Sequence, residues 1–221
     1  MGRTRLSEPT VCTKGKFITL EGGEGAGKST QVKRLVAMLT AAGKDCLATR
    51  EPGGAPAAEE IRRLLVEGAV DRWQPMSEVL LHNAARIEHL TATVQPALDA
   101  GKIVVSDRFS DSTLAYQGFG HGLDTAAITN LHWLLYKDFK PDLTLALDLP
   151  LEESMKRARA CSDSEDRYER MGKNFHERLR RGFLEIAVAE PARCVLIDAT
   201  GDEESVHERI MVALRERLDL P

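Results

Sequence analysis

The sequence predicts an α/β fold, a single three-layer domain whose parallel sheet is covered by helices on both faces. Short runs of consecutive apolar residues recur along the chain, as is typical of strands that are buried on both faces. Stretches with helical periodicity separate these runs, and a glycine-rich turn joins the first run to the first helix. No repeat and no low-complexity linker divides the 221 residues, a length that suits one domain.

The first half of the chain alternates strand and helix signals. Residues 17–20 form an apolar run that ends in glycines, which predicts a buried strand. A helical pattern follows over residues 28–42 and stops at Gly43, a residue type that often ends helices. Residues 46–49 predict a second strand, and residues 59–67 predict a helix behind a turn rich in proline and glycine.

The second half continues the alternation. Residues 77–100 have helical periodicity and a glycine just past their end, so they predict one long helix. Apolar runs predict three more strands, with helices between them, at 103–105, 143–149 and 194–197. Residues 203–218 predict the last helix.

The long helix predicted over residues 77–100 has two stripes. Its apolar positions are Leu80, Ala84, Ile87, Val94 and Leu98. The opposite stripe is polar, with residues three or four apart: Glu78, His82, Arg86 and His89. Such a stripe is usually a solvated face, and a row of side chains that line a site is the alternative.

Composition and charge exclude some classes of protein. Apolar residues make up 43% and charged residues 29%, as in ordinary globular proteins. The net charge of −4 argues against a general nucleic-acid binder, which needs a basic surface. No apolar run approaches the roughly 20 residues that span a bilayer, and no apolar segment follows Arg3 and Arg5 as in a secretory signal. We therefore expect a cytoplasmic protein without a membrane or nucleic-acid polymer as partner.

Two segments are expected to lie outside the packed core. Residues 1–15 are polar and predict a flexible tail before a domain over residues 16–221. The polar stretch 161–170 lies between two helices and predicts a lid over about residues 160–171. The cysteines lack the spacing of metal ligands and are expected to be reduced thiols: Cys12, Cys46, Cys161 and Cys194.

The turn after the first strand matches the phosphate-loop (P-loop) pattern G-x-x-x-x-G-K-[ST]. Glycines let backbone N–H groups converge on phosphate oxygens, and the next helix adds its positive N-terminal end. Lys28 would reach the β- and γ-phosphates of ATP, and Ser29 would offer its hydroxyl to Mg²⁺. The residues expected to bind ATP are Gly22, Gly23, Glu24, Gly25, Ala26, Gly27, Lys28, Ser29 and Thr30. GTPases, motor ATPases and small-molecule kinases share such loops, so nucleotide binding is predicted without its use.

Charged residues near the loop suggest what else it contacts. Glu24 is an acid inside a phosphate cradle and would repel the ligand unless it contacts a second substrate, or points to solvent. Asp107 and Arg108 follow the third strand, at the sheet edge where ligands of α/β proteins bind. Asp107 could hold the water shell of a metal ion, and Arg108 could grip a phosphate by its planar fork. An ordinary surface pair is the alternative for these two residues.

Three further groups of residues lie at comparable positions. Residues 49–54 follow the second strand with the sequence TREPGG, and Arg62 lies on the next helix. A single helical turn would present three hydrogen-bonding groups from Thr113, Tyr116 and Gln117. Arginines bracket the predicted lid and could close on a transferring phosphoryl group, or form ordinary surface pairs: Arg157, Arg159 and Arg167.

Together these segments resemble the thymidylate kinases of the bacterial type, with an acidic phosphate loop and arginines in the lid. The resemblance covers nearly the whole chain from Lys16 onward. Its carriers are EGGEGAGKST (21–30), TREPGG (49–54), AAR with the following EHL (84–90), SDRFSDSTLAYQG (106–118), KPDLTLALDLP (140–150) and KRARACSDSEDRYE (156–169). The loop is shared by many families, whereas REPGG, DRF and STLAYQG at these spacings are specific to this one.

The resemblance implies a P-loop domain with a five-stranded parallel sheet of nucleoside monophosphate kinase type, in a homodimer. It implies in-line transfer of the γ-phosphoryl from ATP, with Mg²⁺, to the 5′-phosphate of dTMP. The metal would be held by Ser29 and Asp107. By the same resemblance the catalytic residues would be Lys28, Arg108, Arg157, Arg159 and Arg167.

The resemblance also implies which residues bind the acceptor. Glu24 would contact the sugar or its surroundings, and Glu51 would line the phosphate side. The acceptor phosphate would be held by Arg62 and Arg108. The thymine edge would be read by Arg86 and Gln117 beside Thr113, whereas Tyr116 would lie under the deoxyribose and disfavour a ribose.

Two positions depart from the family pattern. His82 stands where relatives carry a phenylalanine that stacks on thymine, so we expect acceptor affinity to fall as pH falls through a histidine pKa near neutrality. Cys161 stands where relatives often carry another lid arginine.

The alternatives to a thymidylate kinase are a kinase for another nucleotide or nucleoside, a regulatory nucleotide switch and a non-catalytic scaffold. The base-reading motif N-K-x-D of a GTP switch does not occur in the sequence.

Overall fold

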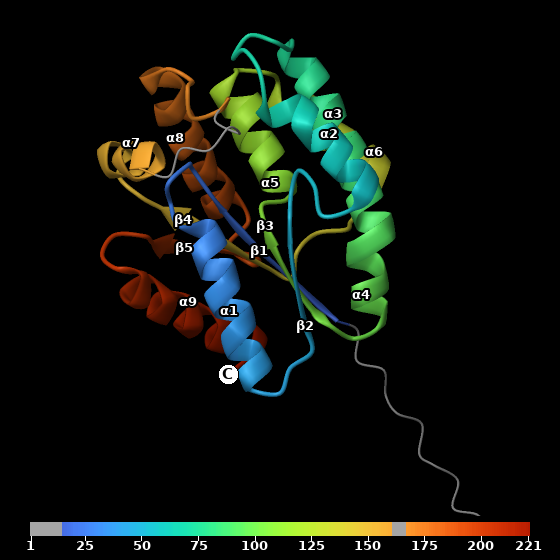
Figure 1. Cartoon of the computed structure of the whole chain (residues 1–221), viewed down its shortest axis with the longest axis vertical. Helices are drawn as coiled ribbons and strands as arrows, with labels where there is room; N and C mark the ends of the chain where they lie inside the picture. The colour runs from blue at the N-terminus through green and yellow to red at the C-terminus, as the bar shows by residue number, and fades with distance from the viewer. Residues whose placement is uncertain (1–14, 161–166) are drawn as a thin grey trace, which may run out of the picture.

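The computed structural model describes residues 15–160 and 167–221, apart from the side chains of residues 159 and 160. Its 5-stranded sheet has the order β2-β3-β1-β4-β5, and all neighbouring strands run parallel. The strands are β1 (Lys16–Gly22), β2 (Cys46–Arg50), β3 (Ile103–Asp107), β4 (Leu143–Asp148) and β5 (Cys194–Asp198). All of the predicted strands are present, and the predicted fold class is confirmed (Figure 1).

The helices also follow the predicted order. The long helix predicted over residues 77–100 is a continuous series of helical segments in which a π-helical stretch separates two α-helices. The helical elements are α1 (Lys28–Ala41), α2 (Pro56–Val66), α3 (Pro75–His89), η1 (Leu90–Val94), α4 (Gln95–Asp99), α5 (Ser110–Thr113), η2 (Leu114–Gly120), α6 (Thr125–Tyr136), α7 (Leu151–Ala160), α8 (Lys173–Ala189) and α9 (Glu203–Leu218).

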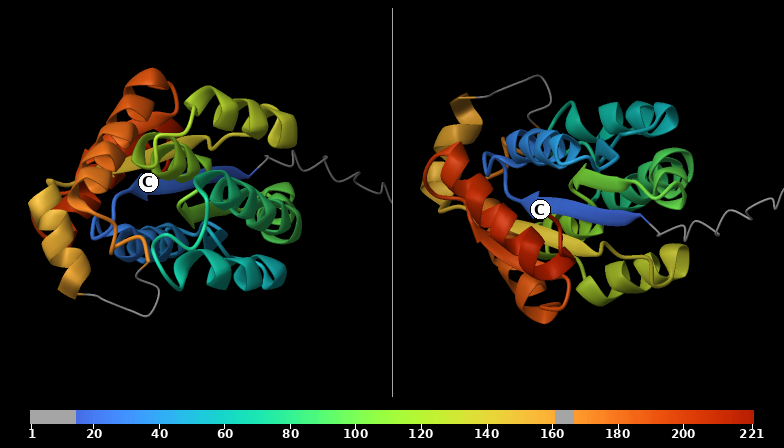
Figure 2. Two further views of the ribbon diagram at one scale, coloured as in Figure 1. Left: turned by 90° about the horizontal axis from the view of Figure 1, so that it is seen from above. Right: turned by 90° about the horizontal axis from the view of Figure 1, so that it is seen from below.

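Helices cover the sheet on both faces, as Figure 2 shows. Successive side chains of a strand point to opposite faces, so β1 contributes Ile18 to one core and Phe17 to the other. The Ile18 face packs against α1 and α9, through apolar residues such as Leu35 and Ile210. The opposite face packs against η1, α4, η2 and α8, which contribute Leu179 among others.

The carboxyl ends of β1, β2 and β3 place the candidate residues side by side. Leu20 of β1 pairs with Asp107 of β3, and Asp107 in turn pairs with Arg50 of β2. In the sheet, β2 and β3 lie on one side of β1, and β4 and β5 lie on the other side. The order in which the chain adds strands therefore reverses between β3 and β1. Ligands of open α/β sheets bind at such a switch point, outside the carboxyl ends of the strands.

On α3 the polar stripe faces the interior and the apolar stripe faces the surface, which is the reverse of the usual arrangement. Glu78, Arg86 and His89 are buried, whereas Leu80 is 55% exposed and Ile87 is 41% exposed. The polar stripe is therefore no solvated face, because it points into the molecule. The apolar positions Val94 and Leu98 further along are buried as their pattern suggests.

The boundaries of the described chain bear on three expectations. Residues 1–14 lie outside it, but Gly15, placed in the predicted tail, donates from its backbone N–H to the Leu98 carbonyl at 2.9 Å. Cys46 and Cys194 are free thiols, and the other two cysteines fall outside the described residues. Across residues 15–160 and 167–221, no helix is long and apolar enough to cross a membrane.

Candidate active site

The phosphate loop joins β1 to α1 in the predicted position. Lys28 is buried, and its ammonium donates to the Gly23 carbonyl at 2.7 Å, so the side chain folds back over the loop. Gly25 has φ of +70°, and a Cβ there would lie 2.4 Å from the Ser154 carbonyl oxygen. Only glycine therefore fits at this point, because the backbone of α7 packs directly on the loop.

Ser29 and Asp107 have the chemistry of a Mg²⁺ site. The Ser29 hydroxyl donates to Asp107 Oδ2 at 2.5 Å, beside the loop and Lys28. Both offer hard oxygen ligands, which Mg²⁺ prefers. The described part of the chain holds no cluster of three or more His, Cys, Asp or Glu residues that could bind a metal. The donor set therefore fits an ion that takes its other ligands from phosphate and water.

Glu24 points inward, which excludes the solvated alternative for this residue. Its Oε1 accepts from the Tyr116 hydroxyl at 2.5 Å and from Arg108 Nη2 at 2.9 Å. Burial alone would raise the pKa of Glu24, but the charges of Arg108 and Lys28 outweigh burial and lower it to about 2. The carboxylate is thus ionised and anchors two side chains that the sequence placed at the acceptor.

Arg108 is fixed from several sides. Its Nη1 donates to the Gly22 carbonyl at 2.8 Å and to Ser112 Oγ at 3.2 Å, and the guanidinium lies 4.9 Å from the centre of the Tyr116 ring. The residue has φ of +72°, an unfavourable conformation for a non-glycine residue that is often found at functional sites. The alternative of an Asp107–Arg108 surface pair is excluded, because Arg108 contacts Glu24 instead.

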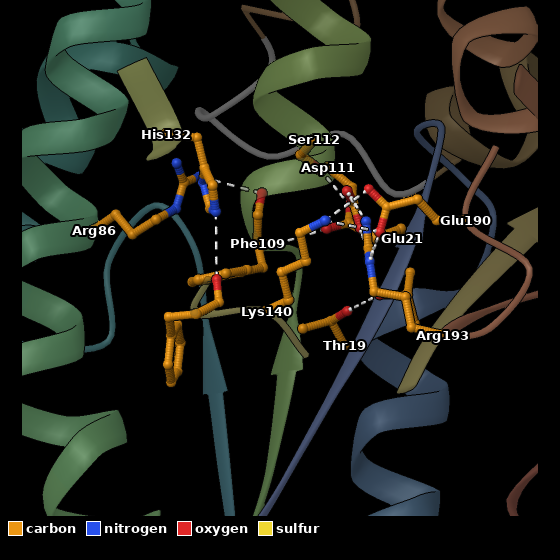
Figure 3. Close-up of polar contacts among 12 residues, drawn as sticks. Thr19, Glu21, Arg86, Phe109, Asp111, Ser112, His132, Lys140, Glu190 and Arg193 are labelled. Atoms are coloured by element: carbon orange, nitrogen blue, oxygen red, sulfur yellow. Dashed lines mark hydrogen bonds and ion pairs between the residues drawn. The ribbon is translucent and has the colours of Figure 1, made fainter. Parts of the chain in front are cut away.

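Sequence reasoning missed Glu21, the buried last acid of β1. Its Oε1 accepts from the Phe109 backbone N–H at 2.7 Å, and its Oε2 accepts from the Ser112 hydroxyl at 2.5 Å (Figure 3). Burial and the neighbouring Asp111 raise the pKa of Glu21 to about 8. Glu21 thus stabilises the turn that carries Arg108. A charged residue inside an otherwise apolar strand was the available signal.

A second buried contact holds the start of α5. Arg193 donates from Nη1 to Asp111 Oδ2 at 2.6 Å and from Nη2 to Asp111 Oδ1 at 2.8 Å (Figure 3). Arg193 Nη1 also reaches the Thr144 hydroxyl of β4 at 2.8 Å. This bidentate pair ties the segment after Arg108 to β4 and to the residue before β5.

A cavity of about 630 Å³ including space open to solvent, here called the inner cavity, lies between α3, α5 and η2. Arg86 lines it and is held by three contacts: Nε donates to Glu51 Oε2 at 2.7 Å, and Nη2 donates to Thr113 Oγ1 at 3.0 Å and to the Phe109 carbonyl at 3.2 Å. Every residue predicted to bind the acceptor substrate lines the inner cavity: Glu24, Glu51, Arg62, His82, Arg86, Arg108, Thr113, Tyr116 and Gln117.

Glu51 and Arg62 lie on the wall of the inner cavity nearest the phosphate loop. Glu51 is buried, and its Oε1 contacts His89 Nδ1 at 2.9 Å while its Oε2 accepts from Arg86. Burial would raise the pKa of Glu51, but the charge of Arg86 and the contacts with His89 lower it. Arg62 donates to the Pro52 carbonyl at 2.7 Å, which keeps its side chain close to the REPGG turn.

His82 lines the inner cavity, but it does not titrate where the sequence suggested. Its Nε2 lies 3.1 Å from the Tyr168 hydroxyl. Burial and the charge of Arg86 lower the pKa of His82 to about 3. The expected loss of acceptor affinity with falling pH near neutrality is therefore wrong for this residue, because the imidazole stays uncharged throughout that range.

The lid arginines differ from one another in position. Arg157 lies beside the phosphate loop and donates to the Gly201 carbonyl at 3.1 Å and to Glu153. The side chain of Arg159 falls outside the described residues, as do residues 161–166 of the predicted lid.

Arg167 is a correction to the predicted catalytic set. Its side chain is 0% exposed and donates to Glu78 and to the carbonyls of Leu65 at 3.1 Å, Ala69 at 2.9 Å and Val70 at 2.9 Å. These contacts fasten the end of the predicted lid to the segment after α2. The guanidinium is occupied there and lies apart from the residues around the phosphate loop.

The inner cavity opens toward a second cavity over the phosphate loop, here called the loop cavity. It measures about 1770 Å³ including space open to solvent, and it is lined by Lys28, Ser29, Asp107 and Arg157 among others. Five charged residues line both cavities: Glu24, Glu51, Arg62, Arg108 and Glu169. Two molecules bound in the two cavities would therefore meet at these charged side chains.

Comparisons with known proteins agree with this geometry. A family model described as thymidylate kinase matches residues 20–210. The chain is 50% identical to a thymidylate kinase of Caulobacter vibrioides, covering 94% of this chain and 100% of that protein. A thymidylate kinase of Rhizorhabdus wittichii is 49% identical, covering 92% and 99%. A crystal structure of a thymidylate kinase from Ehrlichia chaffeensis superposes with a TM-score of 0.72 at 34% identity, covering 91% of this chain and 99% of that chain.

Proposed function

The chain belongs to the thymidylate kinase family, and we propose that its loop cavity binds ATP while its inner cavity binds dTMP. The protein is an enzyme that transfers a phosphoryl group from ATP to dTMP and forms ADP and dTDP. The observation that supports the assignment of the cavities is the wall that they share, on which Arg62 and Arg108 supply two cations. A transferring phosphoryl group needs two phosphates to meet among cations, and this wall provides that meeting point.

Transfer would be direct and in line, from the γ-phosphate of ATP to the 5′-phosphate oxygen of dTMP. The attacking oxygen is already anionic, so the reaction needs no strong general base, and positioning plus charge stabilisation carry most of it. Lys28 would hold the β- and γ-phosphates, and Arg108 would hold the acceptor phosphate with a guanidinium that its neighbours already orient. Because this orientation exists before substrate binds, little reorganisation is needed during transfer.

Mg²⁺ is the proposed cofactor, held by Ser29 and Asp107. When bound, the ion would neutralise charge on the phosphate oxygens of ATP.

The inner cavity has features that suit thymine and deoxyribose. Arg86 and Gln117 are proposed to read the polar edge of the base, with Thr113 beside them and His82 against its plane. Tyr116 is proposed to lie under the sugar, where its hydroxyl is already taken by Glu24. A ribose 2′-hydroxyl would have to fit beside this bonded pair, which is the proposed reason for a preference for deoxyribose.

Arg157 is the proposed lid arginine for the ATP phosphates, because it lines the loop cavity. Arg159 stays a candidate from the sequence alone. We propose that a lid over about residues 160–171 closes on ATP, although its C-terminal part, from Arg167 onward, would be held by α2 and α3 as a fixed hinge.

A homodimer is the proposed assembly, supported by an exposed apolar surface on α3 and α6. Leu80 and Ile87 on α3 are 55% and 41% exposed, and Trp133 and Leu134 on α6 are 57% and 62% exposed. The Tyr136 hydroxyl of α6 donates to the Asn83 carbonyl of α3 at 3.0 Å, so the two helices are neighbours. Sedimentation equilibrium should give twice the chain mass of 24.4 kDa, and a monomer at micromolar concentration would contradict the proposal.

The free thiols also suit the proposed cytoplasmic location.

An acceptor panel tests the assignment of the inner cavity. ADP formation from ATP and Mg²⁺ is followed by a coupled assay with dTMP, dUMP, dCMP, dGMP or UMP. We expect strong turnover with dTMP and weaker turnover with dUMP, which lacks the methyl group. Preference for another acceptor would keep the fold and the phosphate chemistry but reject the assignment of the base site, with His82 as the first residue to examine.

A further inference from the structure

Glu78 on α3 is a buried carboxylate beside the inner cavity, and it is not among the residues that line that cavity. Its side chain is 0% exposed. Burial alone would raise the pKa of Glu78, but the contacts with His121, Arg167 and Gln117 outweigh burial and lower the pKa to about 2. An ionised carboxylate can only accept hydrogen bonds, so each neighbour must turn a donor toward it.

The side-chain amide of Gln117 is one of these neighbours. Its Nε2 donates to Glu78 Oε2 at 2.9 Å, and the residue is fully buried. Its Oε1 has no hydrogen-bond partner among the residues that the structure describes. Turning the amide over would place Oε1 against the carboxylate and leave two acceptors in contact, which is strongly unfavourable in a buried place. The carbonyl oxygen is therefore the atom that Gln117 has left for a ligand.

We propose that Glu78 is a positioning residue for base selection: it fixes the Gln117 amide so that the carbonyl oxygen is available to the acceptor base. This inference rests on the proposed binding of dTMP in the inner cavity. A carbonyl oxygen pairs with an N–H group, which thymine and uracil carry at N3. Cytosine carries a lone pair at N3, so it would face the oxygen of Gln117 with a second acceptor.

The same carboxylate has a structural contact that uses its other oxygen. Glu78 Oε1 accepts from Arg167, which also donates to one carbonyl in α2 and to two carbonyls after it. Glu78 Oε2 accepts from Gln117 and from the Tyr168 hydroxyl at 3.1 Å, and His121 Nε2 lies 3.5 Å from it. A purely structural role would depend on the contacts with Arg167, Tyr168 and His121, and not on which end of the Gln117 amide faces the base. Variants that change one contact and keep the other therefore separate the two roles.

The test compares kcat/KM for dTMP, dUMP and dCMP in the wild type and in Glu78→Gln. The substituted amide can donate to Gln117 Oε1, which lets the Gln117 amide turn its NH₂ toward the base. We expect the preference for dTMP over dCMP to narrow by roughly tenfold. The preference for dTMP over dUMP should stay the same, because both bases carry N3–H. Equal losses with all three acceptors would overturn the proposal.

Arg167→Met is the matched control, because it removes the structural contact and leaves Glu78 and Gln117 in place. We expect lower stability or turnover in this variant but an unchanged ratio of dTMP to dCMP. A wild-type enzyme that fails to phosphorylate dTMP would reject the proposed function itself, before any variant is compared.

A measurement on the wild type covers the case in which Glu78→Gln does not fold. The NH₂ signal of Gln117, assigned by its loss in Gln117→Leu, should be protected from hydrogen exchange by the contact with Glu78. Protection should persist when dTMP binds, since the base meets the oxygen. Loss of protection on binding would mean that the amide turns, and would overturn the proposal.

Discussion

Replacing Lys28 with Met should abolish phosphorylation of dTMP while the fold remains intact. Lys28 is buried at the floor of the loop cavity, and burial together with the charge of Arg108 lowers its pKa. Methionine fills a similar volume but cannot balance the charge that spreads over the phosphate oxygens during transfer. We expect kcat/KM to fall by about 10³-fold or more in the coupled assay.

Lys33→Met is the matched control for this variant. Lys33 lies on the same helix, α1, and is exposed to solvent, so its loss should leave turnover near the wild-type value. Thermal unfolding of both variants would show whether the fold is retained. Turnover of Lys28→Met close to that of Lys33→Met would contradict the role assigned to the phosphate loop.

Replacing Arg108 with Met should affect the acceptor more than ATP. The guanidinium is held over the shared wall of the two cavities by Gly22 and Glu24, where the acceptor phosphate would lie. We expect kcat/KM for dTMP to fall by about 10²- to 10⁴-fold, with a smaller change in KM for ATP. Initial rates with each substrate varied in turn would measure both.

Two further variants are compared with Arg108→Met: the conservative variant Arg108→Lys and the surface control Arg181→Met. Lysine keeps the charge without the planar fork, so it should recover only part of the lost rate. Arg181 is largely exposed and pairs with Glu185 on the surface of α8, so its loss should change neither KM. A rise in KM for ATP alone in Arg108→Met would mean that Arg108 serves the donor instead of the acceptor.

The sheet could be predicted because its strands are buried on both faces. A strand such as β4 is mostly apolar on both faces, and this pattern is visible in a single sequence. The phosphate loop was equally visible, since Gly25 and Lys28 are required by local backbone and charge geometry. These features depend on residues that are close together in the chain.

The direction of α3 could not be predicted in the same way. Periodicity separates Leu80 and Ile87 from Glu78 and Arg86, but it does not say which stripe faces the protein. The polar stripe turns inward because it finds buried partners on β2, on the turn after β2, on η2 and at Arg167. The apolar stripe is left at the surface, where a second subunit would cover it.

Arg167 and His82 were misread for a related reason. Arg167 belongs to the predicted lid, but its partners Leu65, Ala69 and Val70 lie about 100 residues earlier in the chain. No local pattern announces such a contact. The pKa of His82 depends on burial near Arg86, which only the packed structure reveals.

The most direct test of the central claim is the amount of dTDP and ADP formed in one reaction. Wild-type enzyme, ATP, Mg²⁺ and dTMP are incubated together, and the nucleotides are separated by anion-exchange chromatography at several times. Direct transfer between the two cavities predicts equal amounts of dTDP and ADP at every time, and negligible ADP when dTMP is left out. ADP that accumulates without dTDP would show that water, and not dTMP, accepts the phosphoryl group, and would contradict the account.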